Sequence, residues 1–212
     1  MKKEHVILVF PHPDDEAFFC SGTVMDFVSR GVPVTYVCLT MGELGRGLGG
    51  ANRQTLPELR LKEFKKSCSI LGITDIRLWG YLDKTIEFEE PERILQRLLR
   101  LMEEVQPTLV ITFYPGHSRH PDHDATGELV VKAVRRLPEE LRPTVYGSAI
   151  FKKFIEHVGA ADVANDVTPY LDRKTASIKA YPSQFMKYIK SIDAGHMEGV
   201  PDYRIERFWI LE

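Results

Sequence analysis

The segment VILVFPHPDDE, residues 6–16, decides the fold of this chain. Its first five residues form an apolar run that predicts a buried strand. One histidine and three acids follow at once, at the carboxyl end of that strand, which is where open α/β sheets form their ligand crevices. Three adjacent carboxylates on a buried scaffold repel one another unless a cation balances them. The segment therefore predicts an α/β fold with a cation site after its first strand.

Strand-like and helix-like segments alternate along most of the chain, as expected for a mostly parallel sheet flanked by helices. Further strands are predicted at 34–40, 75–79, 109–113 and 144–151, and helices at 16–30, 56–71, 92–105 and 122–136. The regular alternation of strands and helices ends in the last third of the chain. This last third predicts two polar helices at 169–180 and 184–192 and a short strand at 207–211. No linker or repeat divides the chain, so one domain over residues 1–212 is expected.

The composition is that of an ordinary globular protein, with 43% hydrophobic and 27% charged residues and a net charge of −2. This balance gives no general attraction to nucleic acid or anionic membranes. The apolar run at the amino terminus is too short for a signal peptide or a membrane span, so a cytoplasmic location is expected. Cys20, Cys38 and Cys68 form no C-x-x-C pair and are expected to be buried, reduced thiols.

A second cluster, His120-Pro121-Asp122-His123, follows the predicted strand at 109–113. His12 and Asp15 lie three residues apart across a strand-to-helix turn, and His123 would reach the same point from the neighbouring junction. A catalytic zinc takes three such ligands and keeps a position open for water. A lone His-x-x-Asp is more often a helix cap, but the paired clusters favour a metal site. Zinc is the expected metal, and ferrous iron is the alternative because the same ligands suit it.

The remaining residues of the clusters have the chemistry of a hydrolase. Asp14, which is not needed as a ligand, is placed to take a proton from metal-bound water. A protonated His120 would stabilise an oxyanion or protonate a leaving group. Asp122 is placed to hydrogen-bond an imidazole and keep it charged and oriented. For Glu16, a functional role and a capping role at the helix start are equally open.

Residues 42–52 hold five glycines and Arg46, and they leave the carboxyl end of the second predicted strand. A segment so rich in glycine has little intrinsic order. It is interpreted as a lid over the crevice, with a solvated turn as the alternative. It does not match a phosphate-binding P-loop, because no Gly-Lys-Ser/Thr follows.

The motif Pro11-His12-Pro13-Asp14-Asp15-Glu16, together with His120-Pro121-Asp122-His123, resembles the PIG-L/LmbE family of metal-dependent N-deacetylases. Arg60-x-x-Glu63 and Lys179-Ala180-Tyr181-Pro182-Ser183-Gln184 extend the resemblance over most of the chain. Within the family, the loop at 41–47 and the compact length are most similar to the bacillithiol-biosynthesis deacetylases. The resemblance implies a Rossmann-like fold and hydrolysis of an N-acetyl group from a glucosamine conjugate.

For the site, the resemblance implies zinc bound by His12, Asp15 and His123. It implies Asp14 as general base and His120 as electrostatic or acid partner, with Asp122 supporting His120. Some relatives carry a tyrosine where this chain has Ser118, and Tyr181 or Tyr203 is the candidate substitute. A homo-oligomer is a further expectation from the family.

The implied substrate is a small molecule, N-acetylglucosaminyl malate. Its carboxylates would need cationic partners, and arginine pairs well with carboxylate in a bidentate fork. Arg53 is the first choice and Arg46 the second, and the alternative is that both are solvated loop charges. Other amides of chitobiose or mercapturic type are rival substrates. A non-catalytic sugar-binding module is the rival class, and the intact Asp14 argues against it.

Overall fold

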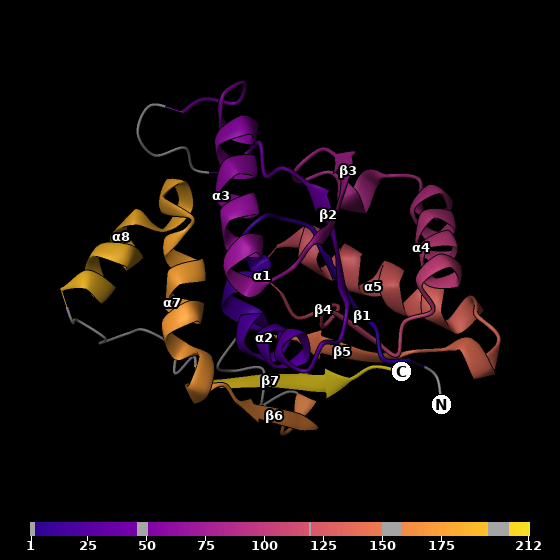
Figure 1. Ribbon diagram of the computed structural model, residues 1–212. Coiled ribbons are helices and arrows are strands. Elements are labelled where there is room, and N and C mark those ends of the chain that lie inside the picture. The colour runs from indigo at the N-terminus through magenta and orange to yellow at the C-terminus, as the bar shows by residue number, and fades with distance from the viewer. Residues whose placement is uncertain (1–2, 46–50, 119, 150–157, 195–203) are drawn as a thin grey trace.

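The computed structural model describes residues 3–45, 51–118, 120–149, 158–194 and 204–212. These residues form a seven-stranded sheet with the order β3-β2-β1-β4-β5-β7-β6 (Figure 1). The strands are β1 (Val6–Phe10), β2 (Val34–Thr40), β3 (Asp75–Tyr81), β4 (Leu109–Phe113), β5 (Thr144–Ser148), β6 (Val163–Asp166) and β7 (Ile205–Ile210). Strands β1 to β5 are parallel to one another, whereas β7 is antiparallel to β5 and β6. The expected Rossmann-like, mostly parallel sheet is confirmed.

Helices cover both faces of this sheet. They are α1 (Asp15–Phe19), α2 (Ser21–Ser29), α3 (Leu56–Leu71), α4 (Pro91–Val105), α5 (Pro121–Arg136), α7 (Leu171–Lys179) and α8 (Pro182–Asp193). Short 3₁₀ helices are η1 (Ile86–Phe88), η2 (Glu139–Leu141) and η3 (Thr168–Tyr170). Figure 1 shows α2, α3, α7 and α8 on one side of the sheet and α4 and α5 on the other.

Strand β1 shows why the sheet is buried on both faces. Side chains alternate across a strand, so neighbouring residues face opposite layers. Val6, Leu8 and Phe10 belong to the core under α2, α3 and α7, while Ile7 and Val9 belong to the core under α4 and α5. All five are fully buried. The strand order reverses between β1 and β4, so their carboxyl ends border the crevice at the switch point.

The single helix expected over 16–30 is wrong, because the chain forms α1 and α2 with a break at Cys20. The cause lies in β7. The Glu206 carboxylate accepts hydrogen bonds from the backbone N–H groups of Gly22 and Thr23, at 2.9 and 2.7 Å. A carboxylate there satisfies the free amides of a helix start, and it therefore favours a new helix after Cys20.

Strands β6 and β5 also differ from expectation. β6 has no counterpart in the predicted elements, because its four residues alternate between exposed and half-buried positions and contain no apolar run. β5 ends at Ser148 rather than extending to residue 151, and residues 150 and 151 lie outside the described ones. All three cysteines are free and buried, as expected. One domain over residues 1–212 stays a prediction.

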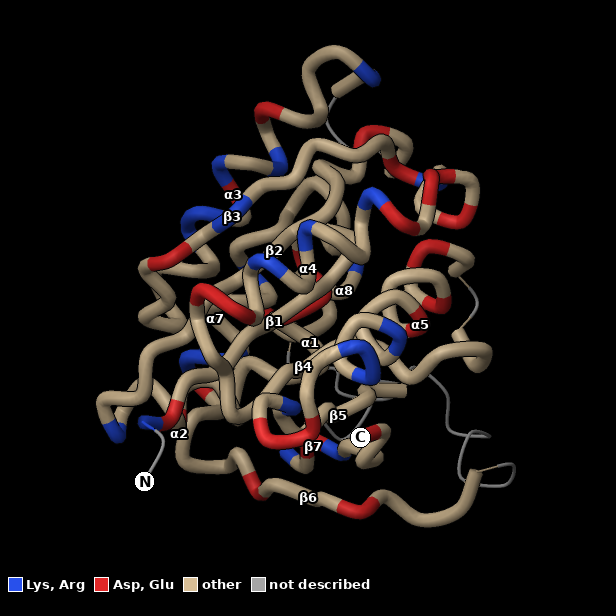
Figure 2. The backbone as a smooth tube through the Cα atoms, turned by 90° about the vertical axis from the view of Figure 1, so that its right-hand side faces the viewer, with Lys and Arg blue, Asp and Glu red and all other residues tan. Residues whose placement is uncertain are grey.

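In the view of Figure 2, acidic and basic segments occur on most of the visible elements, and acidic ones gather at the upper right, above α5. Among the described residues, no helix has both the length and the apolar character needed to cross a bilayer.

Candidate metal and catalytic site

The two histidine-acid clusters meet because β1 and β4 are parallel neighbours whose carboxyl ends share one edge of the sheet. His12 Nδ1 lies 3.1 Å from His123 Nε2. The Asp15 carboxylate, at the start of α1, lies 3.7 Å from His12 Nδ1 and 3.5 Å from His123 Nε2. The three residues predicted as metal ligands therefore converge on one point.

This donor set fits a divalent metal ion. Zinc binds nitrogen and oxygen ligands at roughly 2.0–2.2 Å, so ligand atoms of a tetrahedral site lie roughly 3.3–3.6 Å apart. The observed separations run from 3.1 to 3.7 Å, with Asp15 Oδ2 facing His12 and Asp15 Oδ1 facing His123. Two overlapping groups of residues place one donor atom each within 4.8 Å of one another: His12, His120 and His123, and His12, Asp83, His120 and Asp122. Asp15 belongs to neither group. A His/Asp group that could bind a metal is thus present.

Two carboxylates fix the orientation of the His12 ring. Its Nε2 lies 3.1 Å from Asp83 Oδ1 and 3.2 Å from Asp122 Oδ2. Since carboxylates accept hydrogen bonds, Nε2 carries a proton and Nδ1 is the atom turned toward His123. Burial lowers the pKa of His12, but the bonds to Asp122 and Asp83 outweigh burial and raise it to about 10. The raised pKa favours the protonated ring, and a metal cation would take the place of the proton at Nδ1.

The other two predicted ligands favour their neutral forms. Burial raises the pKa of Asp15 well above its ordinary value, against the opposing charge of His12. Burial and the His12 charge lower the pKa of His123 to about 2. A neutral imidazole is the form that binds metal, and a divalent cation would return the buried carboxyl to its charged form.

Asp14 has a backbone φ of 116°, a left-handed conformation that side chains rarely adopt. Its Oδ2 accepts a 2.7 Å hydrogen bond from Arg60 Nη2, and both side chains are buried. Burial raises the pKa of Asp14 to about 6, against the lowering effect of Arg60 and His12. A carboxyl with a pKa close to neutrality suits a general base, because it can both take up and return a proton.

Glu16 is fully buried and lies below the site rather than in it. Its Oε1 accepts hydrogen bonds of 2.6 Å from both Ser67 and Tyr181, and its Oε2 accepts one of 2.9 Å from Tyr36. Oε2 also accepts from the backbone N–H of Asp14, at 3.2 Å. Glu16 thus connects the strained Asp14 backbone to the core. Tyr181 is engaged in this core network and does not line the pocket.

His120 is half-buried and caps the start of α5. Its Nδ1 accepts a 3.3 Å hydrogen bond from the Asp122 backbone N–H, so the neutral ring carries its proton on Nε2. Burial and the His12 charge lower the pKa of His120. The Asp122 carboxylate contacts His12 and accepts from the backbone N–H groups of Lys84 (2.6 Å) and Ile86 (3.1 Å). In the structure it orients His12, and its charge opposes the lowering of the His120 pKa. Its predicted support of His120 stays a prediction.

His12, Asp14, Asp15, His120 and His123 line a pocket of about 500 Å³. One wall is apolar and is formed by Phe18, Phe19 and Phe185. Four polar residues of the pocket were not predicted as site residues: Arg60, Asp83, Lys84 and Gln184. Asp83 and Lys84 had one available signal, because they follow β3 at the same edge of the sheet as the two clusters.

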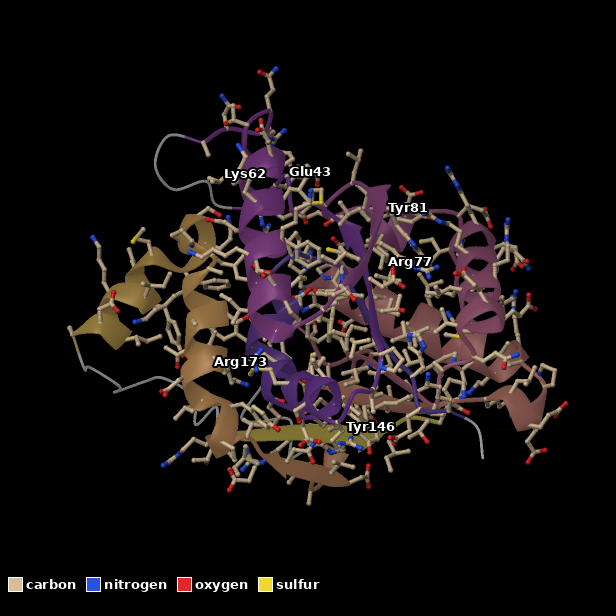
Figure 3. The ribbon with its side chains drawn as sticks, viewed as in Figure 1. Glu43, Lys62, Arg77, Tyr81, Tyr146 and Arg173 are labelled. Atoms are coloured by element: carbon tan, nitrogen blue, oxygen red, sulfur yellow. The ribbon has the colours of Figure 1, made fainter. Side chains whose placement is uncertain are left out.

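Asp83 also links the site to the loop after β2. Its Oδ2 accepts a 2.9 Å hydrogen bond from the Leu44 backbone N–H, and its own N–H donates to Glu43 Oε2 at 3.0 Å. Figure 3 shows Glu43 near the carboxyl end of β2. The proposed lid is described only in part, since residues 46–50 lie outside the described ones, Arg46 included.

The remaining predicted site residues are not placed in this pocket. Arg53 is exposed and is not among the residues that line it. Tyr203 lies outside the described residues. Substrate binding by Arg53 and Arg46 stays a prediction.

Comparison with known proteins agrees with this chemistry. The PIG-L family, described as GlcNAc-PI de-N-acetylase, matches residues 7–134, which include both clusters. A probable N-acetyl-alpha-D-glucosaminyl L-malate deacetylase 2 of Bacillus anthracis is 44% identical over 99% of this chain and 96% of its own length.

Among solved structures, the N,N'-diacetylchitobiose deacetylase of Pyrococcus horikoshii is similar, with a TM-score of 0.77 and 23% identity over 98% of this chain and 84% of that one. The 4-carboxy-2-hydroxymuconate hydratase of Pseudomonas putida has the same TM-score, with 19% identity over 99% of this chain and 96% of that one. At these identities the structural likeness shows the fold alone, and a deacetylase and a hydratase share that fold.

Proposed function

Because this chain belongs to the PIG-L family and is an N-deacetylase, we propose that it removes the acetyl group of N-acetyl-α-D-glucosaminyl L-malate by metal-assisted hydrolysis. That substrate is named for a relative 44% identical over nearly the whole chain, and it belongs to bacillithiol biosynthesis. Zinc is the proposed metal and the cytoplasm the proposed location. The observation that carries the proposal is the convergence of His12, Asp15 and His123 beside Asp14 in one pocket.

We assign the metal ligands to His12, Asp15 and His123. A bound divalent cation would lower the pKa of water and polarise the acetamide carbonyl. Asp14, which lines the same pocket, takes the proton of the attacking water. The Nε2–H of His120 donates to the oxygen that becomes negative, and this donation does not require a charged ring. Asp83 and Asp122 keep His12 in the orientation that serves the metal.

The test is a turnover assay on N-acetylglucosaminyl malate beside free N-acetylglucosamine, with zinc or ferrous iron restored to the apo-protein. Released acetate and free amine should appear in equal amounts, and the malate conjugate should be the better substrate. Diacetylchitobiose and an N-acetyl thiol conjugate belong in the same panel, because a preference for either would replace the proposed substrate. Sugar binding without acetate release, with metal bound, would favour the non-catalytic rival.

A further inference from the structure

Lys84 follows Asp83 at the carboxyl end of the edge strand β3 and has a backbone φ of 64°, in the left-handed region. Its backbone N–H donates a 2.6 Å hydrogen bond to Asp122 Oδ2, an oxygen that also lies 3.2 Å from His12 Nε2. The carboxylate that orients a proposed metal ligand thus also holds the backbone of Lys84. This backbone position brings the lysine side chain to the pocket wall.

The ammonium of Lys84 has N–H donors available for a ligand. Among the described residues its Nζ makes one contact, a long 3.4 Å hydrogen bond to the Leu44 carbonyl. An ammonium carries three N–H donors, so a ligand can take up the others. Lys84 is exposed, so its charge reaches the pocket mouth without a large desolvation cost. The neighbouring Asp83 carboxylate is occupied by His12 and by the Leu44 amide.

Arg60 is the other lysine or arginine on the described pocket wall, and its guanidinium already donates hydrogen bonds within the protein. Its guanidinium donates to Asp14 Oδ2 and to the backbone carbonyls of Pro13 and Gly42. It is 3% exposed and is fixed beside the proposed base. Among the described residues of the pocket wall, Lys84 is therefore the cation left to pair with an anionic group of the substrate.

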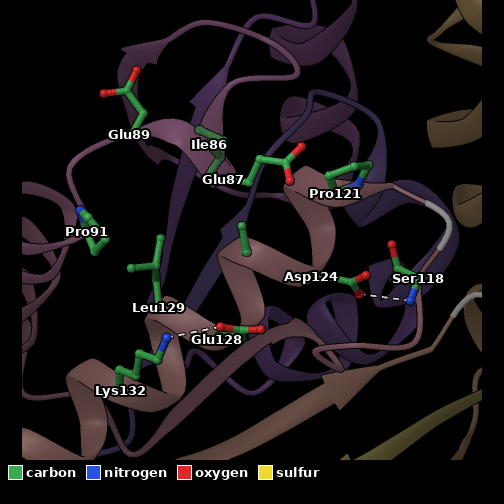
Figure 4. Close-up of a pocket in the computed structure, with 11 residues that line it drawn as sticks. Ile86, Glu87, Glu89, Pro91, Ser118, Pro121, Asp124, Glu128, Leu129 and Lys132 are labelled. Carbon is green, nitrogen blue, oxygen red and sulfur yellow. Dashed lines mark hydrogen bonds and ion pairs between the residues drawn. The ribbon is translucent and has the colours of Figure 1, made fainter.

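The surface on the other side of the His120–Pro121 segment repels anions. A second pocket there includes Ser118 and Pro121 in its wall and is rich in carboxylates (Figure 4). These acids are Glu87, Glu89, Asp124 and Glu128. Among the described residues of that wall, Lys132 is the one cation, and its Nζ is paired with Glu128 at 3.0 Å. The distribution of charge thus directs an anionic substituent toward the Lys84 side.

We propose that Lys84 determines specificity for an anionic aglycone, by binding a carboxylate of the substrate with its ammonium. This inference rests on the proposed function, since it names the partner of the malate group. Lys84 is a substrate-binding residue here and takes no part in proton transfer. Its loss should therefore act on kcat/KM for anionic substrates, mainly through KM.

The test compares kcat/KM for N-acetylglucosaminyl malate with kcat/KM for the uncharged methyl N-acetylglucosaminide. Lys84→Met keeps the length of the side chain and removes its charge. A charge-assisted hydrogen bond corresponds to a loss of about 10- to 100-fold, which we expect on the malate conjugate. The loss on the methyl glycoside should be at least several-fold smaller, and Lys84→Arg should recover most of the selectivity. Thermal melting shows whether each variant is folded.

Two matched variants sharpen the result. Lys132→Met removes a lysine on the acidic side of the segment and should leave both rates close to those of the unmodified enzyme. Arg53→Met tests the arginine expected from the sequence: a selective loss there, with none in Lys84→Met, would overturn the Lys84 assignment. Equal losses on both substrates in Lys84→Met would also overturn it. If the unmodified enzyme does not hydrolyse the malate conjugate at all, the proposed function fails and the inference fails with it.

Discussion

Asp14 combines a strained backbone with a buried side chain, and both features are maintained by neighbours. Glu16 accepts from its N–H, and Arg60 donates to its carboxylate. Strain of this kind persists only where the surroundings compensate for it, and it is common at active sites. In this conformation the Asp14 carboxylate contacts Arg60 and lines the pocket. The proposed division between ligand and base thus depends on one backbone angle.

Replacing Asp14 with Asn should leave the metal in place and remove most of the turnover. The amide has nearly the same size and can still accept from Arg60, but it cannot take a proton from water. General-base catalysis contributes about 10²- to 10⁴-fold, so kcat should fall by about that factor. Metal content and kcat are measured on the same preparation. A variant that keeps a near-normal kcat would show that Asp14 is not the base.

Glu16→Gln should destabilise the fold by about 1–3 kcal/mol. The glutamine amide would place its N–H₂ group where one carboxylate oxygen of Glu16 now accepts hydrogen bonds. Ser67 and the tyrosines can rotate their hydroxyls, but the Asp14 backbone N–H cannot become an acceptor. Urea unfolding measures the loss, and kcat should fall as well. Glu58→Gln, on the exposed face of α3, is the matched control and should barely move the urea midpoint. An unchanged midpoint in Glu16→Gln would contradict the network's role.

At the scale of elements, helix α3 connects the site to the carboxyl-terminal helices. Arg60 donates to Asp14, and one turn later Glu63 accepts from the N–H and hydroxyl of Ser183, at 2.8 and 2.6 Å. The Arg-x-x-Glu spacing is visible in the sequence, and it places both residues on one helix face. The partners could not be predicted from the spacing, since they lie 46 and 120 residues away in the chain.

A buried ion pair joins four elements: α7, β7, α1 and α2. Lys174 of α7 contacts Glu206 of β7, and both side chains are almost fully buried. Lys174 also donates to the Phe18 carbonyl at 3.0 Å, while Glu206 holds the first amides of α2. The break between α1 and α2 is therefore imposed by a strand about 180 residues later, which local sequence patterns do not contain.

Glu206→Gln should destabilise the protein by about 3–5 kcal/mol, because it leaves the Lys174 charge buried without a counter-charge. Adding Lys174→Met removes that charge, so the double variant should be more stable than Glu206→Gln alone. The free energy of unfolding in urea is the measurement. Asp193→Asn breaks the exposed pair with Lys179 and should cost no more than about 1 kcal/mol. A loss of stability no larger than this in Glu206→Gln would show that the Lys174 charge does not need its buried partner.

At the scale of the whole molecule, the sequence predicted what local patterns encode. The bounds of β2, β4 and α3 agree because apolar runs, helical periodicity and the Gly72 cap mark them. The two clusters meet as expected because their strands are neighbours. Asp83 and Lys84 were missed because they carry no motif and depend on the placement of β3. The antiparallel β6–β7 edge was missed for a similar reason, since its pairing joins distant segments.

The metal site also joins distant parts of the chain, since His12 and His123 lie 111 residues apart and anchor β1 to α5. An ion held by both should stabilise the whole fold. Zinc at a free concentration 100 times its Kd raises the free energy of unfolding by about 2.7 kcal/mol. For a chain of this size each kcal/mol raises Tm by about 2–4 °C, so the apo-protein should gain about 5–10 °C. His12→Ala should lose most of this gain, whereas His5→Ala, at the opposite end of β1, should keep it. An equal gain in His12→Ala would place the ion elsewhere in the molecule.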